Sequence, residues 1–227
     1  MSQRDLYVVV ADLDAENAVR SLLCERQAAL GICLRFNPDR PPLGDLLRYS
    51  GRDSGCYRDA VDLLRPQRQT HRHALLIFDR HGCGVEKKSR VDIETDVERR
   101  LCENGWAREA VCVVVIEPEL EAWVWSASPH VAKVLGWQDD YSALQSFLIA
   151  SRLWEEGGLK PTLPKEAMEC ALRKKNKPFG APLFSELAKQ VGLSRCKDPA
   201  FKKLYNQLRQ WFPLESDPQF GAVRNSV

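Results

Sequence analysis

Apolar residues along this chain gather in four short runs, and segments with helical spacing separate the runs. The runs are residues 5–11, 32–36, 74–79 and 111–116. Apolar side chains at consecutive positions are typical of strands that are buried on both faces of a parallel sheet. Apolar positions three and four residues apart predict helices between them, at residues 14–29, 56–64 and 90–104. This alternation predicts an α/β fold with a mostly parallel sheet flanked by helices.

The pattern changes after Trp137. Pro118 marks a break before a short expected helix over residues 119–126, and the segment between 36 and 55 is expected to be a loop. Proline and glycine separate the later segments, which predict helices at 141–154, 164–174, 182–191 and 198–211. We therefore predict two parts. They are an α/β domain over residues 1–137 and a helical, basic C-terminal subdomain over residues 138–227.

Composition narrows the class of protein. The 227 residues are 44% hydrophobic and 28% charged, which is ordinary for a globular protein. No apolar run approaches the roughly 20 residues of a membrane span, and the first residues lack signal-peptide architecture. The eight cysteines include no CxxC pair, so free thiols in a reducing compartment are expected. We expect a cytoplasmic protein that makes no membrane contact.

Carboxylates stand directly after three of the predicted strands. Asp12 and Glu16 follow the first strand, Asp79 ends the third, and Glu119 and Glu121 follow the fourth. In open α/β sheets the ligand crevice lies beyond the carboxyl ends of the strands. Mg²⁺ prefers hard oxygen ligands, so these five residues are the candidate metal ligands, with Asp79 as the main one. Asp79, Glu16, Glu119 and Glu121 are also the candidate catalytic residues.

The same acids have a structural alternative, because carboxylates also cap helices and stabilise their first turns. Asp14, Glu16 and Glu119 occupy such positions. Asp79 ends a strand before a glycine loop and has no obvious helix to cap. On a helix, Glu119 and Glu121 point about 200° apart, so only one of them is expected to face the crevice.

The histidines do not predict a zinc site. His71 and His73 precede the strand 74–79, whereas His81 and Cys83 follow it. A strand of this length spans about 20 Å, so the two pairs are expected at opposite ends of the sheet.

Charge is distributed unevenly behind the net value of +2. Between Lys160 and Arg209 basic residues far outnumber acidic ones, and the densest run is Arg173–Lys177. Such a surface can bind nucleic acid through the phosphates. Dispersed Lys and Arg on short helices are also often merely solvated, so both interpretations stay open.

Several segments carry a family resemblance. ADLDAENAVRSLL, DSGCYRDAVDLLR, HALLIFDRHGCG, VIEPELEAWVWS and DPAFKKLYNQLRQWFP resemble a small component of bacterial methylation-associated defence systems. The acid-bearing strands also look like the Toprim-like fold of primases, topoisomerases and OLD-type nucleases. Toprim proteins bind Mg²⁺ through a first-strand glutamate and a later DxD pair. Here Asp79 matches the first acid of that pair, whereas His81 replaces the second acid and Ala11 replaces the glutamate.

The resemblance implies an antiphage-defence component, with two alternatives for its role. One is a Mg²⁺-dependent Toprim-like nuclease, or an enzyme of phosphoryl transfer that handles nucleotides. The other is a catalytically degenerate Toprim-like module that binds partner proteins or DNA and regulates the defence system. The expected partners are nucleic acid, other proteins of the same system and a second copy in a homodimer.

Overall fold

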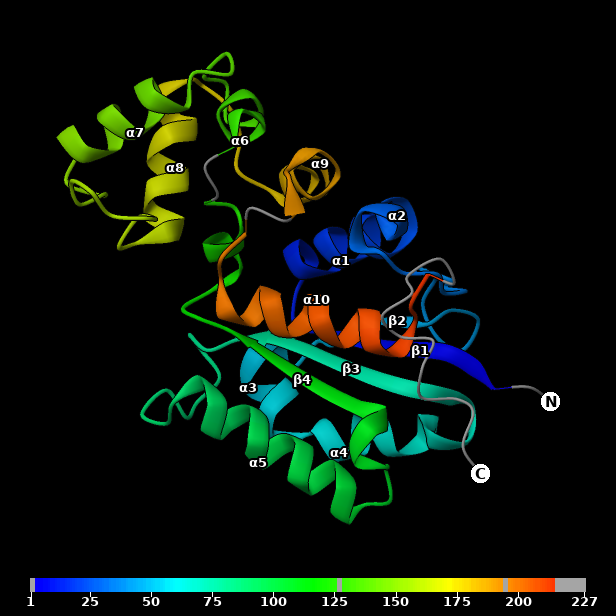
Figure 1. The fold of residues 1–227 in the computed structure, drawn as a ribbon. Helices are drawn as coiled ribbons and strands as arrows, with labels where there is room; N and C mark the ends of the chain where they lie inside the picture. The colour runs from blue at the N-terminus through cyan, green and yellow to red at the C-terminus, as the bar shows by residue number, and fades with distance from the viewer. Residues whose placement is uncertain (1–2, 126–127, 194–195, 215–227) are drawn as a thin grey trace.

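A parallel sheet of four strands runs through the molecule (Figure 1). The structure is a computed structural model that describes residues 3–125, 128–193 and 196–214. The strands are β1 (Arg4–Val10), β2 (Leu46–Arg48), β3 (His71–Asp79) and β4 (Val111–Ile116). They lie in the order β2-β1-β3-β4, and each neighbouring pair is parallel. The predicted α/β class with a parallel sheet is confirmed, and it is consistent with a Toprim-like fold.

Helices cover both faces of this sheet (Figure 1). One layer contains α1 (Leu13–Glu25), α2 (Gln27–Leu30) and α10 (Pro199–Trp211), and the other contains α3 (Arg52–Arg58), α4 (Ala60–Leu64) and α5 (Arg90–Glu103). Successive side chains of a strand point to opposite faces. Leu6, Val8 and Val10 of β1 therefore pack in the first layer, whereas Tyr7 and Val9 pack in the second.

The C-terminal part is helical, as predicted. Its helices α6 (Pro129–Val134), α7 (Tyr141–Ala150) and α8 (Pro164–Lys174) form a lobe at the upper left of Figure 1. Helix α9 (Ala181–Gln190) packs along α1, where the hydroxyls of Ser21 and Ser185 are 2.8 Å apart. Helix α10 returns to the sheet, and its Phe201 shares one apolar core with Ile77 of β3. The predicted parts 1–137 and 138–227 thus have a core in common.

The prediction of a strand over residues 32–36 is wrong. Among the described residues, its one pairing is an isolated bridge between Ile32 and Pro213. The amide of Gln27 bonds both backbone groups of Leu34, at 2.9 Å to the N–H and 3.0 Å to the carbonyl. Because these groups are already satisfied locally, they are not available for a ladder.

The fourth strand, β2, lies instead in the segment that the sequence predicts as a loop. It pairs with β1 in the register Val8 to Leu46 and Val10 to Arg48. Its three residues are too few to show a period, and only Leu46 of the three is fully buried. Tertiary pairing with β1, rather than local pattern, makes this segment a strand.

The predicted helix over 119–126 is also wrong. A single 3-10 turn, η3 (Leu120–Trp123), follows β4 there, and residue 126 lies outside the described residues. A separate helix, α6, then begins at Pro129, where the prediction places none. Proline is favoured at the first helical position, so Ser128-Pro129 is a local signal for a new helix start.

The open edge of β4 is covered by charged side chains. Glu98 and Glu94 of α5 accept hydrogen bonds from the backbone N–H groups of Val113 and Val115, at 3.0 and 2.9 Å. Lys203 of α10 donates to the carbonyl of Val113 at 2.7 Å and to both glutamates. Unpaired strand edges invite pairing with another chain, and here the edge is capped by side chains. A predicted homodimer would therefore need another surface.

Candidate functional site

A cleft of about 570 Å³ opens at the carboxyl ends of β1 and β3. The chain passes from β1 to β2 on one side and then crosses to β3 on the other. Such a reversal of strand order is where open α/β sheets bind their ligands. Acidic and basic side chains line the cleft together: Asp12, Asp53, Asp79, Glu119 and Glu166 with Arg48, Arg52, His81 and Lys165.

Two aspartates from different elements meet in the cleft. Asp79 ends β3, and its backbone N–H donates to Oδ1 of Asp53 in α3 at 2.8 Å. Burial raises the pKa of Asp79 well above 3.8, and the carboxylates of Asp53 and Asp12 raise it further. Burial also raises the pKa of Asp53, and Asp12 adds to this effect. These carboxyl groups repel one another, so a positive charge placed among them would be stabilised.

Asp12 has a structural role in addition to its place in the cleft. It is the N-cap of α1, and its Oδ1 accepts the N–H of Ala15 at 2.8 Å. The acid that caps α1 is therefore Asp12, whereas Asp14 and Glu16, for which the sequence suggests a capping or first-turn role, lie in the first turn.

The two glutamates after β4 differ in position, although they lie at a 3-10 turn and not on the helix that the sequence predicts. Glu119 lines the cleft, and its Oε2 is 3.9 Å from Nδ1 of His81. Glu121 is only 4% exposed. Burial raises the pKa of Glu121 to about 7, and Glu119 adds to this shift, whereas Lys165 opposes it. Lys165 of α8 is attracted by Glu121, Glu119 and Asp79, and this attraction raises its pKa despite partial burial.

Glu16 is not brought to the cleft with the other predicted site residues. Its carboxylate is buried and lies 3.4 Å from Arg20 and 3.5 Å from Arg48. Glu16 is one helical turn beyond Asp12, so its side chain projects onto Arg20 and Arg48. Arg48 lines the cleft, but Glu16 does not. The assignment of Glu16 as a catalytic residue and metal ligand is therefore not supported by its position.

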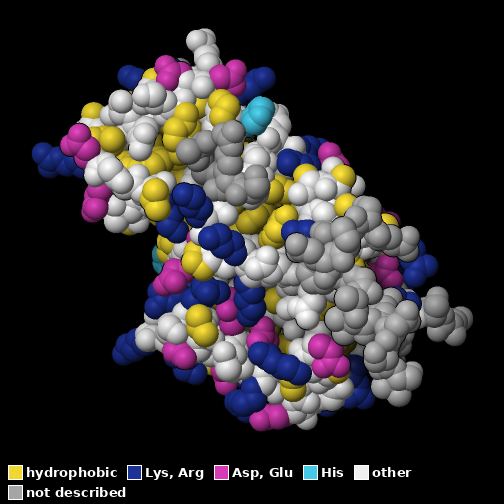
Figure 2. Space-filling model, viewed as in Figure 1, with side chains coloured by type: hydrophobic (Ala, Val, Ile, Leu, Met, Phe, Trp, Pro, Cys, Tyr) yellow, Lys and Arg dark blue, Asp and Glu magenta, His cyan; other side chains and the backbone are white. Residues whose placement is uncertain are grey.

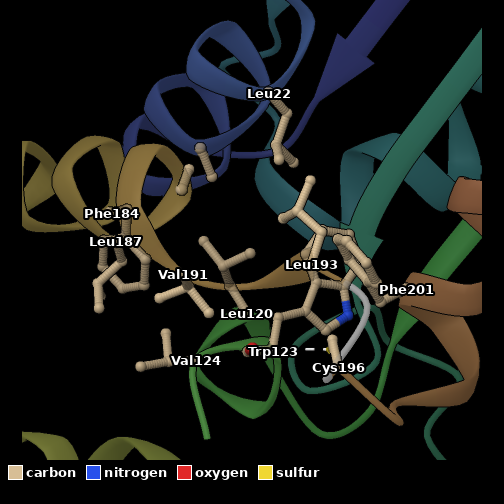
Figure 3. A pocket seen from close by; sticks show the side chains of 12 residues that line it. Leu22, Leu120, Trp123, Val124, Phe184, Leu187, Val191, Leu193, Cys196 and Phe201 are labelled. Carbon is tan, nitrogen blue, oxygen red and sulfur yellow. Dashed lines mark hydrogen bonds between the residues drawn. The ribbon is translucent and has the colours of Figure 1, made fainter. Parts of the chain in front are cut away.

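The η3 turn is held from the side opposite the cleft. Leu120, Trp123 and Val124 line an apolar pocket of about 50 Å³ together with residues of α1 and α9 (Figure 3). The ring of Trp123 packs edge-on against Phe201, with the centroids 5.3 Å apart. Apolar packing on this side fixes the turn that presents Glu119 to the cleft.

The residues of the cleft can bind a divalent cation only if a substrate completes its ligand shell. Across residues 3–125, 128–193 and 196–214, no group of three Asp, Glu, His or Cys side chains is arranged to hold a metal ion. Mg²⁺ commonly uses one or two carboxylates and completes its shell with water and substrate phosphate. Asp53 and Asp79 are adjacent acids with raised pKa values, which fits a cation shared with a substrate but not a closed protein cage.

Two functional candidates are missed by sequence reasoning. Asp53 follows β2, so predicting that strand would have placed it at the same sheet edge as Asp79. Lys165 comes from the helical lobe, and no local pattern connects that lobe to the cleft. Within the described part of the chain, the side chains of Lys165 and Arg52 make no hydrogen bond or ion pair, although nearby carboxylates attract Lys165.

The densest basic run is partly engaged within the fold. Lys175 lies 4.2 Å from the ring centroid of Trp137, and Lys177 donates to the carbonyl of Val134 at 2.8 Å. Over the lower part of the face in Figure 2, Lys and Arg side chains are interspersed with Asp and Glu. Nucleic-acid contact by the C-terminal subdomain stays a prediction.

Scans against protein-family models, curated proteins and solved structures found no match. Among the residues that the structure describes, no helix combines the length and apolar character needed to cross a lipid bilayer.

Proposed function

We propose that this chain is an enzyme of phosphoryl transfer that hydrolyses phosphate esters, such as the phosphodiesters of nucleic acid or nucleotides, with the help of a divalent cation. The observation that supports this most is the Asp53–Asp79 pair at the strand-order reversal, in a cleft that also contains Lys165 and Arg52, whose side chains make no ion pair among the described residues. The proposed setting is antiphage defence, and it rests on the sequence resemblance alone.

In the proposed reaction, the acidic side chains bind the cation and the basic side chains bind the phosphate. Asp53 and Asp79 would hold the cation, which supplies charge neutralisation at the phosphate and activation of a bound water. Lys165 and Arg52 provide hydrogen-bond donors for the remaining phosphate oxygens, since guanidinium and ammonium groups bind phosphate strongly. The His81–Glu119 pair can hold a proton at Nδ1 of His81 beside the reacting group.

A second candidate function is a metal-free module that binds partner proteins or DNA and regulates the defence system. The specific observation in its favour is Lys165, which already places a positive charge near Asp79, Glu119 and Glu121. Ala11 and His81, at positions where Toprim proteins carry acids, favour it too.

Replacement of Asp53 tests the proposed enzyme. The Asp53→Asn protein keeps an oxygen that can accept the N–H of Asp79, so the fold should be retained. Because one carboxylate charge is lost from the cation site, hydrolysis of bis(p-nitrophenyl) phosphate and of single-stranded DNA in Mg²⁺ or Mn²⁺ should fall by about 100-fold.

Asp62→Asn is the matched control, since Asp62 is exposed on α4. Full activity is expected for this variant. Wild-type protein that shows no hydrolysis and no thermal stabilisation by millimolar Mg²⁺ or Mn²⁺ would favour the metal-free module instead.

A further inference from the structure

One wall of the cleft is a continuous segment between β2 and α3. Arg48, Tyr49, Ser50, Arg52 and Asp53 all line the cleft. Arg52 has a φ of 53°, in the left-handed region that residues other than glycine seldom adopt. Backbone strain of this kind persists where the surroundings impose it and is common at ligand sites. The strained residue thus lies directly beside Asp53 in the wall of the cleft.

Tyr49 is held rigidly within this wall. A Cβ atom added to Gly51 or Gly55 would lie 2.4 or 2.8 Å from Cε1 of Tyr49, so the ring rests on backbone that only glycine leaves open. The hydroxyl donates to Oδ2 of Asp59 at 2.8 Å. This bond raises the pKa of Tyr49, as expected for a phenol that donates to a carboxylate. The ring is thus fixed at one face and at its hydroxyl, and it is partly buried against the second apolar core where it lines the cleft.

The neighbours of Tyr49 suit a ligand that has both an aromatic ring and a phosphate. The side chains of Arg52 and Lys165 line the cleft and make no hydrogen bond or ion pair among the described residues. The cleft volume of about 570 Å³ lies within the usual range for small-molecule sites. Aromatic side chains beside a basic groove bind nucleobases by stacking, with little dependence on base identity.

We propose that Tyr49 is a stacking platform for a nucleobase and makes the cleft selective for phosphate esters that carry a base. This inference rests on the proposed function, because it assumes that the phosphate occupies the cleft. The bound unit is a nucleoside phosphate, supplied either as a free nucleotide or as the end of a single strand.

The test compares ligands that differ only in the base. Binding of thymidine 5′-monophosphate, 2-deoxyribose 5-phosphate and a 5′-phosphorylated dT octamer is measured by calorimetry in Mg²⁺. Wild-type protein should bind the mononucleotide about tenfold more tightly than the base-free sugar phosphate, as stacking of one base predicts. An octamer that binds more tightly than the mononucleotide assigns the ligand to a strand end, and equal binding assigns it to a free nucleotide.

Substitutions of Tyr49 then test whether its ring causes the preference for a ligand that carries a base. Tyr49→Leu should remove the tenfold preference and leave sugar phosphate binding within about twofold, whereas Tyr49→Phe should keep the preference. Tyr57→Leu, in α3, is the control, because Tyr57 does not line the cleft: its hydroxyl donates to Asp96 and its ring contacts Arg100.

The possible outcomes separate the inference from the proposed function. Equal wild-type affinity for the mononucleotide and the sugar phosphate overturns the role of Tyr49 and leaves the proposed function intact. A Tyr49→Leu protein that binds both compounds equally less well assigns Tyr49 a structural role only. If neither compound binds the wild-type protein, the proposed function and the inference both fail.

Discussion

Replacing Lys203 with methionine is expected to lower the free energy of unfolding by about 3 kcal/mol, because it removes the cation that two buried carboxylates share. Nζ of Lys203 lies 2.8 Å from Glu98 and 3.1 Å from Glu94, and each glutamate is at most 4% exposed. Arg90 and Arg108 also pair with these glutamates, at 2.6 Å each. Only Lys203, however, connects α10 to both glutamates and to the edge of β4.

The network also fixes the sign of a pH effect. Burial alone would raise the pKa of Glu98, but hydrogen bonds from Lys203 and the Val113 N–H outweigh it, and the pKa lies below 4.5. A carboxyl group with a depressed folded-state pKa stabilises the protein above its unfolded-state pKa. The stabilisation should be complete above about pH 4.5 and should be lost as the pH falls through the lower folded-state value.

Urea unfolding of Lys203→Met measures this effect, and Lys202→Met is the control, since Lys202 is the exposed neighbour. A double-mutant cycle with Glu98→Gln isolates the pair, and a coupling energy of about 1 kcal/mol or more is expected. A loss of less than about 1 kcal/mol in Lys203→Met would mean that the arginines alone neutralise the glutamates.

The network at the edge of β4 shows why sequence patterns predict the strands of the sheet better than the side-chain contacts that cover its edge. The strands near 5–11, 74–79 and 111–116 are predicted because their apolar runs are buried on both faces. Glu94 and Glu98 look like part of a solvated helix face, and Lys203 looks like part of a basic tail. Their meeting depends on how α5 and α10 pack against β4, which no local pattern specifies.

The sequence likewise predicts only some residues of the candidate site. Asp79, Asp12 and Glu119 are predicted at the cleft because they follow strands of one parallel sheet, and the structure brings them there. Glu16 follows the same strand as Asp12, but the intervening helical turn directs it to two arginines. Lys165 reaches the cleft from a lobe far along the chain, so only the folded structure reveals it.

Replacing Asp79 with asparagine is expected to stabilise the protein while it removes activity. Burial and the repulsion by Asp53 and Asp12 raise the pKa of Asp79, so ionising it in the folded state is unfavourable. An acid whose folded-state pKa is raised destabilises the protein little at low pH, where it is protonated in both states. The destabilisation grows as the pH rises above the unfolded-state pKa. The asparagine variant should therefore match the wild type near pH 3.8 and exceed it increasingly toward pH 7.

At pH 7 and without metal, the gain should be about 1 kcal/mol or more, which corresponds to roughly 3 °C in Tm for a chain of this size. Differential scanning fluorimetry from pH 4 to pH 8 measures it, with Asp62→Asn as the exposed control.

Millimolar Mg²⁺ should raise the Tm of the wild type and not of Asp79→Asn, because a ligand that binds only the folded state stabilises it by mass action. Phosphodiester hydrolysis should fall by about 100-fold in the same variant. A variant that is less stable than the wild type at every pH would show that the Asp79 carboxylate supports the fold rather than a cation, and the proposed site would then lose its central residue.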